Sequence, residues 1–253
     1  MHRPAMLIMG GTGSIGSEVA RMAVASGWNV FVFGRSKEKL DMLIASLGKS
    51  CGAQHIFGIA SDIKIEGVIV EVVAAAAAQF GRIDAVVDCL VTGPSEAGVM
   101  GAFESTDPNL YGEFIGLSLV YLERLAHAAI PWLKVSQGSL LALVSDAAMF
   151  PAPRQALLGA ARAAALGFVK NLAAEVARDR VRVNAISLSY VDQTAIAAKL
   201  SAAGSVRFET AKKRAGLGLP RPDDVSPAVL FLCGDGARKI TGQAVSINGG
   251  LNI

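Results

Sequence analysis

A glycine-rich segment stands where the first apolar run of this chain ends. The run Ala5–Met9 leads into residues 10–16, which read Gly-Gly-Thr-Gly-Ser-Ile-Gly, and a helical pattern of apolar residues follows. Glycines permit a tight turn and let a backbone approach a pyrophosphate, while free N–H groups at a helix N-terminus bind the anion. This order of elements predicts a dinucleotide-binding unit, a glycine-rich turn without a ligand being the alternative. The residues assigned to the cofactor here are Gly10, Thr12, Gly13, Ser14, Ile15 and Gly16.

Short apolar runs alternate with longer helical patterns along the rest of the chain. The predicted strands are 5–9, 29–33, 54–59, 84–90, 139–145, 181–188 and 243–247. The predicted helices are 15–26, 36–47, 63–80, 108–134, 154–178 and 223–233. Such alternation, with near-continuous apolar strands, indicates an α/β fold in which helices cover both faces of a parallel sheet. We predict one doubly wound domain over residues 1–253, with its seven strands in the order 3-2-1-4-5-6-7.

The composition excludes several classes of protein. Hydrophobic residues make up 52% of the chain and charged residues 18%, whereas a disordered chain has few apolar and many charged residues. No stretch approaches about 18 uncharged apolar residues, so we expect no membrane-spanning helix. A net charge of +3 is too small to indicate a nucleic-acid surface. The three cysteines lie far apart and the three histidines form no ligand-spaced pair, so we expect no disulfide framework, no metal site and a cytoplasmic location.

The end of the second predicted strand indicates which dinucleotide is bound. An acidic residue at this place would bind the ribose 2′-hydroxyl of NAD, but the chain has Gly34 followed by Arg35. Loss of the carboxylate removes a repulsion, and a guanidinium binds a 2′-phosphate well. The sequence therefore favours NADP(H) over NAD(H), the alternative being that Arg35 is a solvated surface residue.

The segment 192–220 interrupts the alternation of strands and helices. It is polar, contains glycine, and follows the carboxyl end of a strand, which is where ligands bind in doubly wound sheets. We predict that it forms a lid over a small-molecule substrate. Its basic run Lys212-Lys213-Arg214 is compatible with an acidic substrate, although such a run is more often a solvated helix face.

Further motifs resemble those of the short-chain dehydrogenase/reductase family from end to end of the chain. They are Asp62-Ile63 after the third strand, residues 138–145 ending in Ser145, the run 182–186, and Thr241-Gly242-Gln243 with Asn248-Gly249-Gly250. The resemblance implies a single Rossmann-type domain and an NAD(P)-dependent oxidoreductase. It further implies that Asp62, Ile63 and Thr194 contact the cofactor, that Ser145 is the active-site serine, and that helices 108–134 and 154–178 pair subunits into a homodimer or homotetramer.

The chain departs from this family where the catalytic residues are expected. Members reduce carbonyls with a Tyr-x-x-x-Lys motif, but its two positions hold Leu158 and Arg162 here, and the usual asparagine position holds Ser118. Leu158 has no proton to give, and the loss of a positioned general acid typically lowers a rate by about 10²–10⁴-fold. A guanidinium does not release its proton near neutral pH, so Arg162 is no substitute acid.

The remaining candidates for catalysis are a hydroxyl, a cation and a phenol. Ser145 is able to donate one hydrogen bond to an oxyanion, or else it caps the turn after its strand. Arg162 provides positive charge near the nicotinamide and donors for the ribose, or else it lies on a helix surface. Tyr190 is the best remaining proton donor, or else it lines the pocket, whereas Tyr121 is expected in a core or an interface.

Three functions compete on these observations. The first is an NADP(H)-dependent oxidoreductase with altered chemistry, acting on an activated C=C bond, an imine or another substrate that needs little acid help. The second is a cofactor-binding but catalytically silent family member that serves as a regulator or partner subunit. The third is a non-redox enzyme on the same fold: the halohydrin dehalogenases resemble this family and also have arginine at the Arg162 position, but they keep the tyrosine and lose the dinucleotide loop.

Overall fold

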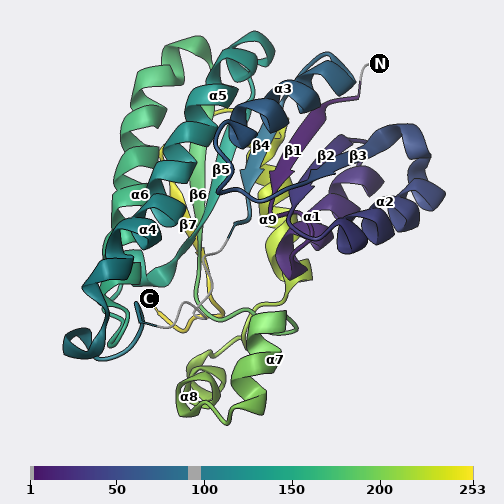
Figure 1. Ribbon diagram of the computed structural model, residues 1–253. Coiled ribbons are helices and arrows are strands. Elements are labelled where there is room, and N and C mark those ends of the chain that lie inside the picture. The colour runs from purple at the N-terminus through teal and green to yellow at the C-terminus, as the bar shows by residue number, and fades with distance from the viewer. Residues whose placement is uncertain (1–2, 91–97, 253) are drawn as a thin grey trace.

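The protein forms a seven-stranded parallel sheet with helices on both faces (Figure 1). The structure is a computed structural model that describes residues 3–90 and 98–252. The strands are β1 (Ala5–Met9), β2 (Asn29–Gly34), β3 (Ile56–Ala60), β4 (Ala85–Asp88), β5 (Ser139–Ser145), β6 (Arg182–Leu188) and β7 (Ala244–Ile247). Their order is β3-β2-β1-β4-β5-β6-β7, and every neighbouring pair is parallel, so the predicted order is confirmed.

The sheet separates two hydrophobic cores because successive side chains of a strand point to opposite faces. Leu7 and Met9 face one core, which is covered by α3 (Val68–Phe80), α5 (Tyr121–Ser136) and α6 (Ala156–Val176). Met6 and Ile8 face the other core, which is covered by α1 (Ser14–Ala25), α2 (Lys37–Cys51) and α9 (Pro222–Cys233). Each such side chain contributes about 1.5–3 kcal/mol through its burial. The two-sided burial explains why β1, at the centre of the sheet, is apolar at every position.

The sheet is less uniform at its β7 edge than the sequence suggests. β1, β4 and β6 are buried along their whole length, but Val245 and Ser246 of β7 are exposed. β7 pairs only with β6, and its other edge has no strand partner among the described residues. Continuous burial therefore holds for the inner strands and not for this edge.

Several element boundaries differ from the prediction, three of them for an identifiable local reason. β4 ends at Asp88 and not at residue 90, because its Oδ1 accepts a hydrogen bond from the Leu90 backbone N–H at 3.0 Å and turns the chain away. α3 begins at Val68 because Gly67 adopts a left-handed conformation at φ 81°. The predicted strand 54–59 begins later, at Ile56, after a short 3₁₀ turn.

The predicted helix 108–134 is interrupted rather than continuous. A 3₁₀ turn (Pro108–Leu110) leads into α4 (Tyr111–Ile115), and a π-helical turn (Gly116–Val120) separates α4 from α5. π turns are rare and often mark functional sites because they leave the regular backbone pairing. Ser118 lies in the middle of this turn and is buried.

The segment 192–220 contains two helices that the sequence analysis did not assign. They are α7 (Ala195–Ala202) and α8 (Val206–Arg214), and they extend below the carboxyl edge of the sheet (Figure 1). Both helices are short and lack a long apolar repeat, so the sequence showed little helical periodicity there. The role of this segment as a lid stays a prediction.

One helix is long and apolar enough to cross a membrane by length and composition alone. It is α6 with the turn that follows it, Ala156–Asp179. In this structure α6 packs on the sheet, where Ala165, Leu166 and Val169 are part of the hydrophobic core. Arg162 and Lys170 interrupt this helix, so the expectation that no uncharged apolar stretch of about 18 residues occurs still holds. α6 covers β5 and β6.

Candidate active site

The glycine loop is built from close contacts between backbone atoms. The Gly13 N–H donates to the Gly10 carbonyl oxygen at 3.0 Å, and Gly10 adopts φ +72°. A Cβ atom on Gly16 would collide with that same carbonyl oxygen. A side chain at this position would therefore push α1 away from the loop, which is the physical reason why the loop requires glycine here.

The N-terminus of α1 is open at this loop. Gly13 is the N-cap residue and is exposed, and no side chain caps the first turn. The N–H groups of a first helical turn have no partner within the helix, so they are available to an anion. Ser14, Ile15 and Gly16 form this turn, and the residues present fit a pyrophosphate.

The adenosine end of the site excludes an acidic residue on steric grounds. A Cβ atom on Gly34 would collide with the Thr12 side chain, so an aspartate here would require Thr12 to move. Arg35 follows and is exposed. Lys39, on the first turn of α2, lines a groove with Thr12, Ser17, Met42 and Leu43. Arg35 and Lys39 are therefore two cations near Gly34, whereas only Arg35 was predicted from the sequence.

The loop after β3 returns to the same corner. The Ser61 N–H donates to the Gly34 carbonyl oxygen at 3.1 Å, so Asp62 and Ile63 lie beside the end of β2. Asp62 is exposed, and its Oδ1 accepts from the Lys64 N–H at 3.0 Å. The structure thus brings the predicted adenine contacts close to Gly34.

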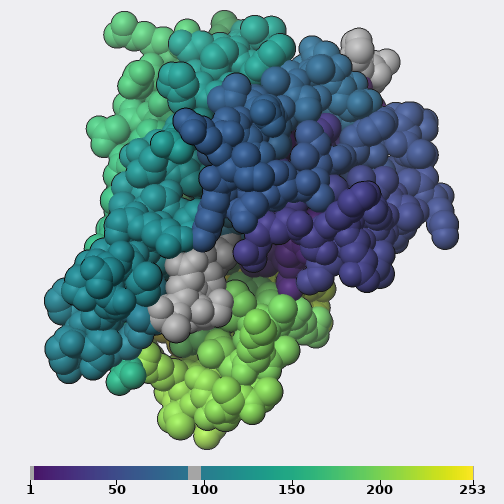
Figure 2. Space-filling model, viewed as in Figure 1, coloured from purple at the N-terminus to yellow at the C-terminus, as the bar shows by residue number. Residues whose placement is uncertain are grey.

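The α7–α8 segment touches the glycine loop directly. The Ala195 N–H donates to Ser14 Oγ at 3.2 Å, although the two residues lie 181 positions apart. Thr194 is the N-cap of α7: its hydroxyl accepts from the Ala197 N–H at 3.1 Å. Figure 2 shows this segment, in light green, below the body of the molecule at the edge where the loop lies. Ser14 and Thr194 thus belong to one corner of the site.

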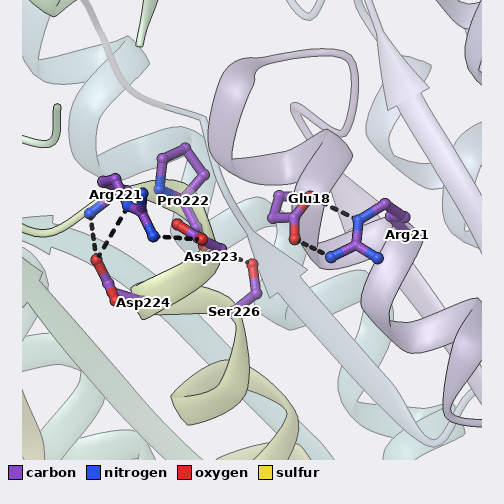
Figure 3. Close-up of polar contacts among 7 residues, drawn as sticks. All are labelled: Glu18, Arg21, Arg221, Pro222, Asp223, Asp224 and Ser226. Carbon is purple, nitrogen blue, oxygen red and sulfur yellow. Dashed lines mark hydrogen bonds and ion pairs between the residues drawn. The ribbon is translucent and has the colours of Figure 1, made fainter. Parts of the chain in front are cut away.

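The segment rejoins the body at the start of α9, beside α1 (Figure 3). The Arg221 N–H donates to Asp224 Oδ2 at 2.8 Å, and the Arg221 guanidinium pairs with Asp223 at 2.8 Å. Ser226 Oγ donates to the Pro222 carbonyl oxygen at 2.8 Å. These contacts fix the far end of the α7–α8 segment to a rigid helix.

Ser145 lies at the carboxyl end of β5 and is half-buried. Its Oγ accepts from the Ala147 N–H at 3.2 Å, which is the turn-capping role that the sequence analysis weighed against catalysis. The hydroxyl proton is not used by this bond, so Ser145 keeps a donor for an oxyanion.

The next residue, Asp146, ties this strand end to the C-terminal part of the chain. Its buried carboxylate accepts four side-chain hydrogen bonds of 2.6–3.0 Å; the donors are Ser187, Ser246, Asn248 and Asn252. The last three are at least 100 residues away in sequence. Asp146 was not predicted from the sequence. The signal that could have found it is its position directly after Ser145, the expected active-site serine.

Arg162 is buried, which rules out the helix-surface alternative. Its side chain is 3% exposed, and Nη1 lies 3.5 Å from the Ser118 carbonyl oxygen of the π turn. Burial lowers the pKa of Arg162, and the nearby Asp88 and Tyr121 oppose that shift. A buried guanidinium needs a counter-charge, because an unpaired buried charge is strongly destabilising.

Asp88 supplies that counter-charge at the end of β4. Tyr121 Oη donates to Asp88 Oδ1 at 3.2 Å, and both residues are buried. Burial raises the pKa of Asp88 to about 6, against the opposing effects of the Leu90 N–H, Arg162 and Tyr121. Tyr121 was expected in a core or an interface, and Asp88 was assigned no role. A lone carboxylate inside an apolar run was the available signal.

The other two positions lie in separate apolar clusters. Leu158 packs with Val99, Phe114 and Ala161, so the expected tyrosine position is part of a small hydrophobic core. Tyr190 packs edge-on against Phe208 of α8, with ring centroids 5.5 Å apart. The Tyr190 ring therefore belongs to the base of the α7–α8 segment.

No metal centre is found in the part of the chain that the structure describes, because no three His, Cys, Asp or Glu residues there are grouped closely enough.

Comparison with known proteins identifies the family. The family model described as enoyl-(acyl carrier protein) reductase matches residues 10–252. This chain belongs to the short-chain dehydrogenase/reductase family. It is accordingly an oxidoreductase of that family, and the resemblance and the fold class inferred from the sequence are both confirmed.

The relatives cover nearly the whole chain. The 3-oxoacyl-[acyl-carrier-protein] reductase FabG of Chlamydia trachomatis is 27% identical over 97% of this chain and 96% of its own. The 7alpha-hydroxysteroid dehydrogenase of Bacteroides fragilis is 26% identical over 98% and 94%. Among solved structures, a short-chain type dehydrogenase/reductase from Mycobacterium ulcerans has a TM-score of 0.88 at 25% identity, over 99% of this chain and 90% of that one. An actinorhodin polyketide ketoreductase with NADPH has a TM-score of 0.86 at 25% identity, over 99% of each chain.

Proposed function

We propose that this protein binds NADP(H) in preference to NAD(H) and transfers hydride to substrates that need little acid assistance. The observation that carries the cofactor preference is the corner formed by Gly34, Thr12, Arg35 and Lys39. An acidic side chain at position 34 has no room beside Thr12, and two cations stand close by. A 2′-phosphate meets attraction there and no repulsion.

The residues of the chain divide the work of holding the cofactor. The backbone of the glycine loop and the first turn of α1 bind the pyrophosphate, and Arg35 and Lys39 bind the 2′-phosphate. The bound nicotinamide supplies or accepts the hydride. Ser145 donates a hydrogen bond toward the substrate oxygen or nitrogen, and buried Arg162 sets the local charge.

The substrate preference follows from Leu158. An unactivated ketone needs a proton on its oxygen as the hydride arrives, and the leucine has none to give. An iminium already carries its charge, and an activated C=C bond delocalises the incoming electrons. We therefore propose these two classes of substrate, with Tyr190 as the reserve proton donor from the α7–α8 segment, which acts as a lid.

The second candidate function is a family member that binds the cofactor without turning over a substrate. It is favoured by one observation: Leu158 is packed into a hydrophobic cluster with Phe114, so this position contributes to packing rather than to a polar pocket. The oxidoreductase is preferred because Ser145 and Arg162 still provide a donor and a charge.

The assembly and the location are proposals as well. α6 carries the small exposed residues Ala160, Ala163 and Ala164, which allow close approach of a second helix, so we propose a homodimer or homotetramer built through α5 and α6. The three free cysteines favour the cytoplasm, and we propose a small molecule as the partner. Light scattering that gives a monomer at micromolar concentration would contradict the assembly.

The decisive experiment has two stages. The protein is titrated with NADPH and with NADH by fluorescence, and it is then screened for hydride transfer to ketones, enones and imines. We expect tighter binding of NADPH and turnover of an enone or imine. Equal affinity for both cofactors would refute the preference, and binding without turnover across the screen would favour the silent family member.

A further inference from the structure

Asp88 lies at the point where the order of the sheet reverses. It is the last residue of β4 and is paired in register with Met9, the last residue of β1. The carbonyl oxygen of the next residue, Cys89, lies 3.0 Å from where a Cβ atom of Gly10 would stand. In open α/β sheets the ligand binds beyond the carboxyl ends of the strands at this switch point. Asp88 is thus a buried carboxyl directly behind the cofactor site.

Asp88 belongs to a buried polar cluster drawn from three elements. Asp88 is 2% exposed, Tyr121 of α5 is 5% exposed and Arg162 of α6 is 3% exposed. Asp88 Oδ1 accepts from Tyr121 Oη at 3.2 Å and from the Leu90 N–H at 3.0 Å. We refer to Asp88, Tyr121 and Arg162 as the switch-point cluster.

Among the described residues, three titratable groups act on Asp88 or are affected by it. Tyr121 faces it from α5, Arg162 from α6, and Cys89 follows it in the chain. Its strand neighbours, Met9 on β1 and Ala142 on β5, have no titratable group. Burial raises the pKa of Tyr121 well above its usual range, and raises that of Cys89 likewise, so both keep their protons near neutral pH.

The Asp88 carboxyl is therefore the group of this cluster that can change charge under ordinary conditions. Burial favours its neutral form, while Arg162, Tyr121 and the Leu90 N–H favour the carboxylate. These opposing effects leave the pKa of Asp88 near 6. A further positive charge nearby would favour the carboxylate, and in a buried site such an interaction is weakly screened.

The oxidised nicotinamide ring carries a positive charge that the reduced ring lacks. We propose that Asp88 exchanges a proton with solvent according to the redox state of the bound cofactor. The carboxyl releases its proton to the buffer when the oxidised cofactor binds, and it retains the proton with the reduced cofactor. This inference rests on the proposed function for the identity of the cofactor, and it adds a role for the switch-point cluster that the hydride transfer itself does not require.

Linkage gives the sign of the effect on affinity. Because binding of the oxidised cofactor releases a proton, its affinity rises as the pH rises through the pKa of Asp88. The affinity of the reduced cofactor does not depend on the pH through Asp88. We expect the ratio of NADP⁺ to NADPH affinity to rise roughly tenfold between about pH 5 and 7.5, since one pKa unit corresponds to a tenfold change.

The test is a calorimetric proton count on the full-length protein. NADP⁺ and NADPH are each titrated at about pH 6 in two buffers that differ in ionisation enthalpy. Both cofactors carry a 2′-phosphate that titrates near pH 6, so the informative quantity is the difference between the two. We expect NADP⁺ to release a fraction of a proton more than NADPH does.

Two variants connect this difference to the cluster. Asp88→Asn should abolish it, whereas Asp84→Asn, which removes a carboxyl at the opposite end of the same strand, should leave it intact. Tyr121→Phe removes a hydrogen bond that favours the carboxylate, so it should move the proton release to higher pH. This variant also serves if Asp88→Asn fails to fold.

The outcomes separate this inference from the proposed function. Equal proton counts for NADP⁺ and NADPH in the wild type would overturn the inference while leaving the cofactor assignment in place. A difference that persists in Asp88→Asn would overturn it as well. Failure of the wild type to bind either cofactor would refute the proposed function, and this inference with it.

Discussion

The two ends of the proposed cofactor site lie at one edge of the sheet, but one is formed mainly by backbone atoms and the other by side chains. At the adenosine end, the loop around Gly10 and Gly16 depends on backbone atoms that leave no space for another side chain, and a Cβ atom on Gly34 would meet the Thr12 side chain. At the proposed nicotinamide end, Leu158 and Arg162 on α6 and Asp88 on β4 contribute side chains.

This difference explains which end kept the family pattern. A substitution in a backbone-built loop displaces the loop, so the site and the local fold fail together. A substitution on a helix face or a strand end leaves the backbone in place, and neighbouring side chains can compensate for it; around the buried Arg162, Asp88 and Tyr121 supply a carboxyl group and a phenol. We infer that the proposed nicotinamide end tolerates substitution more readily than the glycine loop does.

The largest expected effect restores the missing acid at the nicotinamide end. The wild type should reduce simple ketones very slowly, and Leu158→Tyr combined with Arg162→Lys should raise that rate by about 10²–10⁴-fold. The reason is that a tyrosine supplies the proton that leucine lacks. The measurement is ketone-dependent oxidation of NADPH under saturating cofactor.

The control for this prediction is Tyr190→Phe. If the wild type nevertheless reduces a ketone rapidly, Tyr190 is the first candidate donor, and its phenylalanine variant should lose the activity at similar cofactor affinity. Rapid ketone turnover that survives Tyr190→Phe would show that the proton comes from a group placed elsewhere.

The next effect concerns the charge at the adenosine end. Arg35→Ala should weaken NADPH binding by about 1.5–3 kcal/mol, because hydrogen bonds to a charged phosphate are lost. NADH binding should hardly change, since NADH has no 2′-phosphate. Fluorescence titration with both cofactors checks this, and an equal loss for both would mean that Arg35 acts on the fold rather than on the phosphate.

A comparable effect is expected from the backbone of the loop. Gly16→Ala places a methyl group against the Gly10 carbonyl oxygen, and such overpacking typically costs about 1–3 kcal/mol. We expect lower stability together with weaker binding of both cofactors. Gly112→Ala is the matched control, because a Cβ atom there meets no neighbouring atom within 4 Å. Unchanged cofactor binding in Gly16→Ala would contradict the conclusion that the glycine loop cannot accept a side chain.

The last effect, of similar size, concerns the pH dependence of stability. Burial raises the pKa of Asp88 from 3.8 to about 6, so the folded protein holds this proton more tightly than the unfolded chain does. Its stabilising contribution is present below about pH 4 and is lost as the pH rises to about 6. Relative to Asp88→Asn, the unfolding free energy of the wild type should fall by on the order of 2 kcal/mol across this interval. Urea unfolding at a series of pH values measures it, and parallel curves for the two proteins would contradict the assignment.

Much of this protein was determined by local pattern. The alternation of apolar runs and helices fixed the number and order of strands, because each segment must bury its face against its neighbours. The loop at residues 10–16 could be predicted because its glycines lie between a strand and a helix that are adjacent in the sequence. The positions of Leu158 and Arg162 followed from their spacing after Ser145.

Only the tertiary structure decided what surrounds those positions. Arg162 reaches the Ser118 carbonyl oxygen across 44 residues, and Tyr121 meets Asp88 across 33. Asp146 accepts a hydrogen bond from Asn248, which is 102 residues away in the sequence. Ser14 accepts one from Ala195, at the N-terminus of α7 and 181 residues away. None of these pairs leaves a periodic signal, because periodicity reports which face of an element is buried and not which polar groups share the interior. The fold was therefore accessible from the sequence, whereas the charge balance of the site depended on the packing of β4, α5 and α6.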